Sequence, residues 1–317
     1  MTVREKTKRA PFPFSAKKKS GMRGRKRSKA IFLCLILAYP IAHFLLFFVY
    51  VNFNSILMAF KDTATQTFTL FNFSKFFKEI ADATTFVNRS FVNTLWYFFA
   101  GNFIGIPISL FFSYALYKKV FLHRALRVIF FLPSIISAVV LATLFKYLLN
   151  ADGPVNTLLM NLHLIDSPIY FLSDPRYALP TVLFYNVWFG MGVNIVLFSG
   201  ATARIPQDIF EVGRLEGLGF YREFVSVVLP LVWPTVSSVF VLGTIGMFTS
   251  IGPVLMLIET RTLFNVSNIA YFIYYAVSQS SNFEYASAVG LVFTAVGLPL
   301  VLLVRWLLGR CYDDVSF

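Results

Sequence analysis

Six long stretches without charged side chains run through this chain of 317 residues. A helix of about 20 apolar residues crosses the hydrocarbon core of a bilayer, and each stretch comes close to that length or exceeds it. Charged segments separate the stretches, so lipid-compatible sequence alternates with water-compatible sequence. The pattern predicts an all-α integral membrane protein with six transmembrane helices, at about 30–51, 90–117, 125–148, 177–203, 231–258 and 285–305.

A seventh uncharged run, at 262–278, is shorter and contains Asn265, Asn268 and Ser267. We expect it to form an interfacial or re-entrant segment rather than another span.

The composition of the whole chain supports the membrane assignment, since 57% of the residues are hydrophobic and 14% are charged. Soluble domains carry about 25% charged residues.

The net charge of +13 could indicate a nucleic-acid partner, but its distribution points to a membrane instead. Of the 28 Lys and Arg residues, 12 lie in residues 1–29, directly before the first predicted span. A cytoplasmic N-terminus places 21 of them on the cytoplasmic side and 7 outside, as the positive-inside rule requires. We therefore predict cytoplasmic termini and no nucleic-acid partner, with a basic arm at 1–29 that faces anionic lipid, a transmembrane domain at 30–310 and a short tail at 311–317.

The sequence lacks the residues that several kinds of catalysis and ligand binding require. None of the 17 glycines precedes a lysine, so a Walker A phosphate-binding loop is absent. The three histidines, His43, His123 and His163, are far apart and suggest no metal site. No acidic residue falls inside a predicted span, which argues against a proton relay. The chain is not expected to be an enzyme or to bind a metal or cofactor.

One charged segment, at 204–230, interrupts the apolar sequence with glycines at regular places. We expect two short helices around a turn, because Pro206 suits a helix start and Asp208 suits a first turn. Gly217 and Gly219 are expected to break the helix and to permit positive φ. The alternative is an ordinary interhelical loop.

This segment resembles the EAA loop of ABC importer permeases. That motif is Glu-Ala-Ala, three residues, Gly, nine residues, Ile, one residue and Leu-Pro. The chain keeps every spacing with Glu211-Val212-Gly213, Gly217, Val227 and Leu229-Pro230. It departs from the motif at Val212, Gly213 and Val227, and Glu216-Gly217 is similar to the Asp-Gly pair common in such loops.

Other stretches extend the resemblance over about 30–310. The sequences "FLPSIISAVVLATLFKYLLNADGPVN", "TSIGPVL" and "YASAVG" are similar to regions of carbohydrate-uptake permeases of the maltose type. The resemblance implies a type I importer fold in a bacterial cytoplasmic membrane. It also implies a second permease chain, two ATPase subunits that hold ATP and Mg²⁺, and an external solute-binding protein.

The resemblance assigns coupling roles to residues of the loop. Glu211 would pair with a basic group on an ATPase, and Gly217 would form the turn. Leu229-Pro230 would anchor the loop to the fifth span, with Gly213 and Glu216 inside the coupling segment.

Solute contacts would come from aromatic and amide side chains, the groups that usually hold sugars in a concave site. The candidates in spans four and five are Tyr185, Asn186, Trp188, Asn194 and Thr249. The alternative is that these amides and hydroxyls bond between helices while the aromatic rings pack. A permease for a sugar or oligosaccharide is the leading interpretation. Import of a polyol, a glycerol-phosphate-type compound or a peptide-like solute stays open, as does an ion-coupled transporter or channel.

Overall fold

The computed structural model describes residues 20–62, 65 and 67–311. All of the predicted C-terminal tail except Cys311 and most of the basic arm lie outside the described residues. Within the described part the chain is helical, with one isolated antiparallel bridge between Lys61 and Phe68 and no longer strand. The all-α prediction is confirmed.

The chain divides into two units, residues 1–55 and residues 56–317. The described part of the first unit is a single run of helix, α1 (Ser20–His43), the π-helical segment η1 (Phe44–Tyr50) and the start of α2 (Val51–Ala59). Its apolar stretch Ile31–Ala59 is long enough to cross a bilayer. Its most apolar window has a mean hydropathy of 2.4, so these side chains require an apolar surrounding such as lipid.

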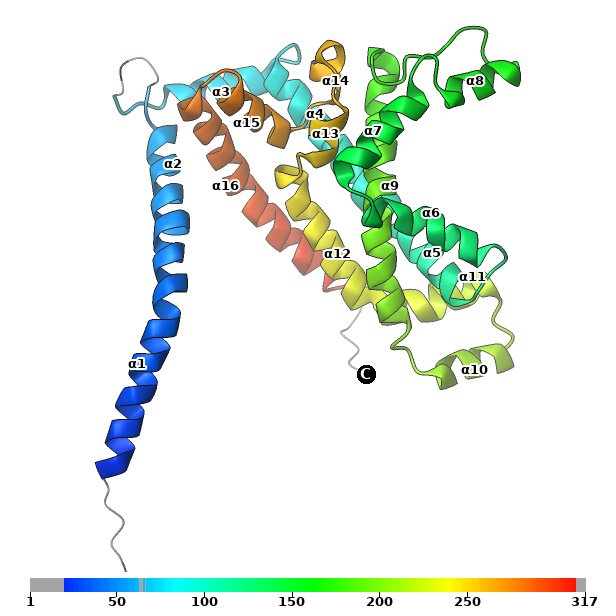
Figure 1. Ribbon diagram of the computed structural model, residues 1–317, viewed down its shortest axis with the longest axis horizontal. Coiled ribbons are helices and arrows are strands. Elements are labelled where there is room, and N and C mark those ends of the chain that lie inside the picture. The colour runs from blue at the N-terminus through cyan, green and yellow to red at the C-terminus, as the bar shows by residue number, and fades with distance from the viewer. Residues whose placement is uncertain (1–19, 63–64, 66, 312–317) are drawn as a thin grey trace, which may run out of the picture. The chain divides into compact units, whose positions relative to one another are not determined.

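The second unit contains the remaining helices, with several short ones among the long ones. Figure 1 shows α3, α14 and α15 gathered at one end of this unit and α10 at the other. The helices are α3 (Phe71–Ala81), α4 (Phe86–Phe99), η2 (Ala100–Gly105), α5 (Ile106–Tyr117), α6 (His123–Ile135), α7 (Ala138–Leu149), α8 (Pro154–Asn161), α9 (Pro175–Thr202), α10 (Gln207–Leu215), α11 (Phe220–Glu223), η3 (Phe224–Val228), α12 (Leu229–Thr249), α13 (Gly252–Leu257), η4 (Thr260–Thr262), α14 (Leu263–Val266), α15 (Ile269–Ser278) and α16 (Phe283–Leu308).

Five continuous helices are long and apolar enough to span a membrane, and a bent pair makes a sixth candidate. The long helices follow the predicted spans, with ends that shift by a few residues in most cases. The continuous ones are Ile31–Ala59, Phe86–Tyr117, Pro175–Thr202, Phe220–Thr249 and Phe283–Leu308.

The third predicted span is the bent pair. Helix α6 and the helical stretch Ala138–Asn161, which begins with α7, are bent by 118° relative to each other. The bend lies at Ile136 and Ser137, where the prediction has one continuous helix. Pro133 removes one backbone donor inside α6, and Ile136 then takes up extended backbone angles that end the helix. Apolar composition alone does not reveal this bend, because the uncharged run Val128–Phe145 continues through it.

The fifth span also differs from its predicted bounds of 231–258. The helix begins at Phe220 rather than after Pro230, and it ends at Thr249. Ser250 has extended backbone angles, and the separate helix α13 restarts at Gly252-Pro253. Proline suits this restart because its missing N–H has no role in a first helical turn.

Two π-helical segments lie directly before prolines. Pro107 follows η2 and Pro230 follows η3, and the residue four positions before each proline falls inside the π-helical segment. A proline ring clashes with the carbonyl at this position in a regular helix. The wider π turn accommodates the ring, so each helix continues through its proline.

Close packing around α9 holds the centre of the second unit together. A Cβ atom on Gly192 would lie 2.8 Å from the carbonyl oxygen of Phe130 on α6, so only glycine permits this approach.

Asp174 caps the start of α9 by accepting from the N–H of Arg176 at 2.9 Å. Hydrogen bonds from the side chain and backbone of Arg176 hold the pKa of Asp174 below its usual value.

Candidate functional site

The segment predicted to couple the chain to an ATPase contains one well-formed amphipathic helix, α10. Phe210 is 1% exposed and Gly213 is buried, so this face of the helix packs against the rest of the unit. The opposite face carries Glu211, Val212 and Leu215, all exposed. Glu211 forms no ion pair or hydrogen bond with any described residue, which leaves its carboxylate available to a partner.

The turn after α10 depends on one glycine rather than two. Gly217 has φ +73°, and the N–H of Leu218 donates to the carbonyl oxygen of Gly213 at 2.9 Å. Gly219 has φ −73°, which any L-residue can adopt. The expectation of positive φ is therefore confirmed at Gly217 and wrong at Gly219.

The departure from the motif at Gly213 has a local explanation. A Cβ atom there would lie 3.2 Å from Cδ1 of Leu218, so the alanine of the motif would press on this side chain. Leu218 folds back over α10 into the space that an alanine methyl would occupy. The departure at Gly213 thus faces the chain's own turn, whereas Val212 and Glu216 face outward.

The second short helix expected in this segment is not separate. Residues from Phe220 onward already belong to the long helix that contains α11, η3 and α12. Leu229-Pro230 therefore lies inside that helix, directly after its π-helical segment. The coupling segment that was predicted as a loop is thus continuous with the spanning helix from Phe220 onward.

A cavity of about 380 Å³ lies between three of the long helices of the second unit. Its walls come from α4 to α5, from α9 and from α12, with contributions from the residues after α12. No charged side chain lines it. Five of the side chains that line the cavity carry an amide or an aliphatic hydroxyl group, namely those of Asn102, Asn186, Asn194, Ser250 and Asn268.

Some of these polar groups are engaged and others are free. The amide of Asn268 donates to the carbonyl oxygen of Ser250 at 2.8 Å, and that of Asn102 donates to the carbonyl oxygen of Phe240 at 3.4 Å. Asn186 and Asn194 form no hydrogen bond with any described residue, although both are half-buried. Their amides can therefore bind a polar solute.

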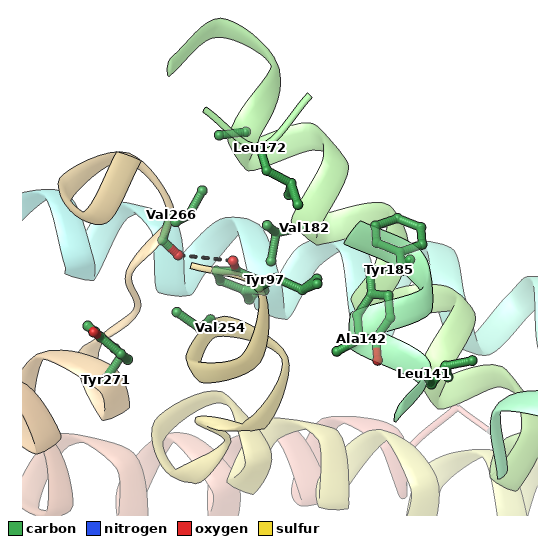
Figure 2. Packing of buried hydrophobic residues seen from close by; sticks show 12 residues of the cluster. Tyr97, Leu141, Ala142, Leu172, Val182, Tyr185, Val254, Val266 and Tyr271 are labelled. Atoms are coloured by element: carbon green, nitrogen blue, oxygen red, sulfur yellow. Dashed lines mark hydrogen bonds between the residues drawn. The ribbon is translucent and has the colours of Figure 1, made fainter. Parts of the chain in front are cut away.

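The other three predicted solute residues do not line this cavity. Tyr185 is 1% exposed and packs against the ring of Phe145, with 4.9 Å between centroids, in the cluster shown in Figure 2. Its hydroxyl has no hydrogen-bond partner among the described residues. Trp188 packs at the edge of the same cluster, whereas Thr249 lines a separate apolar cavity and donates to the carbonyl oxygen of Ile245 at 3.2 Å.

A polar face on α4 is a feature that the sequence reasoning missed. Asn93 donates to the carbonyl oxygens of Asn265 and Ser267, at 3.0 Å each. Tyr97 donates to the carbonyl oxygen of Val266 at 3.0 Å, a bond that Figure 2 also shows. The signal was present in the sequence, since the polar residues recur at the spacing of one helical face, Ser90, Asn93, Thr94 and Tyr97.

These bonds hold the segment 263–269 against α4. Ser90 and Ser267 share a hydrogen bond of 3.2 Å, and the hydroxyl of Thr94 accepts from the N–H of Ile269 at 2.9 Å. The segment leaves its backbone groups outside a regular helix, which a membrane environment tolerates only where protein satisfies them. The interfacial or re-entrant segment expected at 262–278 thus consists of the end of η4, the short helix α14 and the helix α15. The bonds to α4 hold α14 and the start of α15, and Asn268 between them lines the cavity.

Comparison with known proteins identifies the family. Residues 105–311 match the family described as "Binding-protein-dependent transport system inner membrane component". The chain belongs to this family of transporter permeases. It is therefore a multi-pass integral membrane protein of a class that is not enzymatic, and the suspected relationship to ABC importer permeases is confirmed.

Relatives align over nearly the whole chain. Protein LplB of Bacillus subtilis (strain 168) is 27% identical over 312 residues, 93% of each chain. The arabinooligosaccharides transport system permease protein AraP of the same organism is 24% identical over 308 residues, 94% of this chain and 95% of its own. A probable ABC transporter permease of Brucella abortus is 26% identical over 245 residues, 74% of this chain and 83% of its own.

Solved structures show the same fold. A chain of a bacterial ABC transporter involved in the import of the acidic polysaccharide alginate superposes with a TM-score of 0.77 at 22% identity. The alignment covers 91% of this chain and 99% of that one. A second structure of a bacterial alginate ABC transporter, in complex with alginate pentasaccharide-bound periplasmic protein, gives a TM-score of 0.78 over 92% and 99%. The predicted fold of an ABC importer permease is confirmed.

Proposed function

We propose that this chain is one of two permease subunits of a bacterial ATP-driven importer that takes up a sugar or an oligosaccharide. Membership of the binding-protein-dependent family supports import with an external solute-binding protein. Relatives whose names include arabinooligosaccharides, lactose and multiple sugars support a carbohydrate as the solute. The second permease, the two ATPase subunits and the plasma-membrane location follow from the same proposal.

The observation that carries the coupling part of the proposal is the exposed face of α10. Glu211 has no partner in the described residues and lies beside the exposed Val212 and Leu215. A free carboxylate flanked by apolar side chains suits a groove with a basic group, such as an ATPase surface offers. In this proposal ATP and Mg²⁺ bind to those ATPase subunits.

The cavity supports an uncharged, hydroxyl-rich solute over an acidic one. A charged solute leaving water needs a compensating charge, and no charged side chain lines the cavity. The free amides of Asn186 and Asn194 each offer one acceptor and two donors, which match the alternating character of sugar hydroxyls. A second permease chain would close the pathway on its open side.

The coupling proposal is tested by replacing the free carboxylate. Glu211→Ala in the full transporter should lower ATP-dependent uptake by about tenfold or more, since it removes one partner of a charge pair at an interface. It should also weaken copurification of the ATPase. Asp152→Ala, an exposed acid at the opposite end of the second unit, is the matched control and should leave uptake unchanged. Full uptake by the Glu211 variant would contradict the proposal.

The solute proposal has its own test. Asn186→Leu and Asn194→Leu should raise the solute concentration for half-maximal uptake of labelled neutral oligosaccharides, because each removes hydrogen bonds to the solute. Thr249→Val, in the separate apolar cavity, should have no effect. Uptake that prefers uronate oligosaccharides, or a peptide or a polyol phosphate, would exclude a neutral sugar. Uptake that continues without ATP would favour a channel or an ion-coupled transporter.

A further inference from the structure

A buried ion pair lies where the ends of α5 and α11 meet. Glu223 is 3% exposed, and its Oε1 atom contacts Nζ of Lys118, the residue that follows α5. The hydroxyl of Tyr114 donates to the same Oε1 atom at 2.9 Å. A carboxylate this deeply buried needs such compensation, because removing an isolated charge from water costs several kcal/mol.

Lys118 also reaches the proposed coupling helix. Its Nζ atom lies 4.7 Å from the centroid of the Phe210 ring, the buried aromatic side chain of α10. The neighbouring Tyr117 packs its ring on Phe210 with 5.4 Å between centroids, and the amide of Gln207 donates to the Tyr117 hydroxyl at 2.9 Å. Tyr117 and Lys118, at the end of α5, therefore hold α10 at Gln207 and Phe210.

The same ammonium group thus joins three elements. It contacts α10 through a ring face, it belongs to the end of α5, and it pairs with the first turn of the long helix that contains α12. Ile106 at the other end of α5 and Gly243 on α12 both line the cavity. Lys118 therefore contacts α10 and the first turn of the long helix that contains α12, and it directly follows α5.

We propose that Lys118, held by Glu223, is the joint that transmits the movement of α10 to the two helices that wall the cavity. Both residues act as positioning residues, since neither touches the solute or the nucleotide. This inference rests on the proposed function, because it assumes that α10 is moved by an ATPase. It adds a residue outside the EAA spacing to the coupling path.

A cation is suited to this position for two reasons. It stabilises the buried carboxylate of Glu223, and it is attracted to the electron-rich face of the Phe210 ring. A methionine at 118 would fill similar space and keep the apolar packing, but it would lose both attractions. Coupling should therefore fail under a substitution that preserves much of the packing.

The experiment measures solute transported per ATP hydrolysed by the complete transporter in proteoliposomes, with copurified ATPase as a measure of assembly. Lys118→Met and Glu223→Gln should each lower this ratio by about fivefold or more, the scale of a typical coupling free energy, while ATP hydrolysis and assembly persist. Lys118→Arg keeps the charge and should retain most of the ratio. Lys119→Met, which removes the adjacent exposed lysine, should leave it unchanged.

Each other outcome contradicts the inference in a recognisable way. A normal ratio in Lys118→Met overturns the joint while leaving the proposed function intact. If assembly and uptake fall together in both Lys118→Met and Glu223→Gln, the ion pair stabilises the structure and does not transmit movement. Absence of ATP-dependent uptake in the unmodified transporter would instead overturn the proposed function itself.

Discussion

At the scale of single residues, Gly217 and Gly219 differ in what their backbones require. Gly217 adopts φ +73° at the turn after α10, whereas Gly219 adopts φ −73°. The left-handed conformation costs an L-residue about 1–2 kcal/mol, and no such cost arises at Gly219. Only the first of the two glycines is required for the shape of the turn.

Gly217→Ala and Gly219→Ala form a matched pair for this difference. A Cβ atom at either position meets no heavy atom within 4 Å, so steric contact does not separate them. Gly217→Ala should destabilise the turn by about 1 kcal/mol and make α10 more sensitive to limited proteolysis. The Gly219→Ala variant should be cleaved at the same rate as the unmodified protein. Equal proteolysis of the two variants would show that the turn does not depend on positive φ.

At the scale of elements, the polar face of α4 fixes the position of the segment 263–269. Asn93 and Tyr97 of α4 donate to backbone carbonyls of the segment, and Thr94 of α4 accepts from the N–H of Ile269. Asn93 is central because its amide serves two of them, those of Asn265 and Ser267. Asn268 then lies at the cavity wall, bonded to the carbonyl of Ser250.

Asn93→Leu should therefore destabilise the protein. The change leaves two carbonyls without their donor, and an unsatisfied buried polar group costs about 1–3 kcal/mol. Thermal unfolding of the purified protein in detergent should begin at a lower temperature. Val92→Leu, at the exposed neighbouring position, provides the control and should unfold at the original temperature. An unchanged midpoint for Asn93→Leu would mean that other bonds suffice to hold the segment.

At the scale of the whole molecule, the second unit has two distinct ends. The turn between α5 and α6 and the helix α10 belong to the end that we assign to the cytoplasm. The turn between α7 and α8 belongs to the external end. The assignment rests on the excess of basic residues in the predicted cytoplasmic segments.

Single cysteines test this orientation. In a background with Cys34→Ser and Cys311→Ser, which removes both native cysteines, Lys119→Cys should react with a membrane-impermeant thiol reagent only after the membrane is opened. Asp152→Cys should react in intact cells. Both replaced side chains are exposed, so access to solvent does not limit either reaction. The reverse pattern of labelling would invert the proposed topology.

Much of the fold could be predicted because its signals are local. Long apolar runs identify the spans wherever the helix is continuous, as at Pro175–Thr202 and Phe283–Leu308. Helix α10 and the positive φ of Gly217 also followed from nearby residues, a helix start after Pro206 and a glycine at its end. Such features depend on backbone chemistry within a few residues.

The candidate site was predicted less completely, because its members are far apart in the sequence. Asn186 and Asn194 line the cavity as solute candidates, while Tyr185 packs into a cluster and Thr249 lines another cavity. Residue type does not decide between these places, since an amide or aromatic side chain suits either. The rotation of each helix against its neighbours decides it.

The sequence by itself determined the class of the protein, its apolar helices and the EAA-like spacing of the segment 204–230. Hydropathy and backbone preference act over short distances, so they survive without knowledge of the fold. Tertiary structure alone decided the 118° bend between α6 and α7, the pinning of 263–269 and the junction of Lys118 with Glu223 and Phe210. Each of these depends on which helix faces lie together, and that choice is made by packing and by the pairing of buried polar groups.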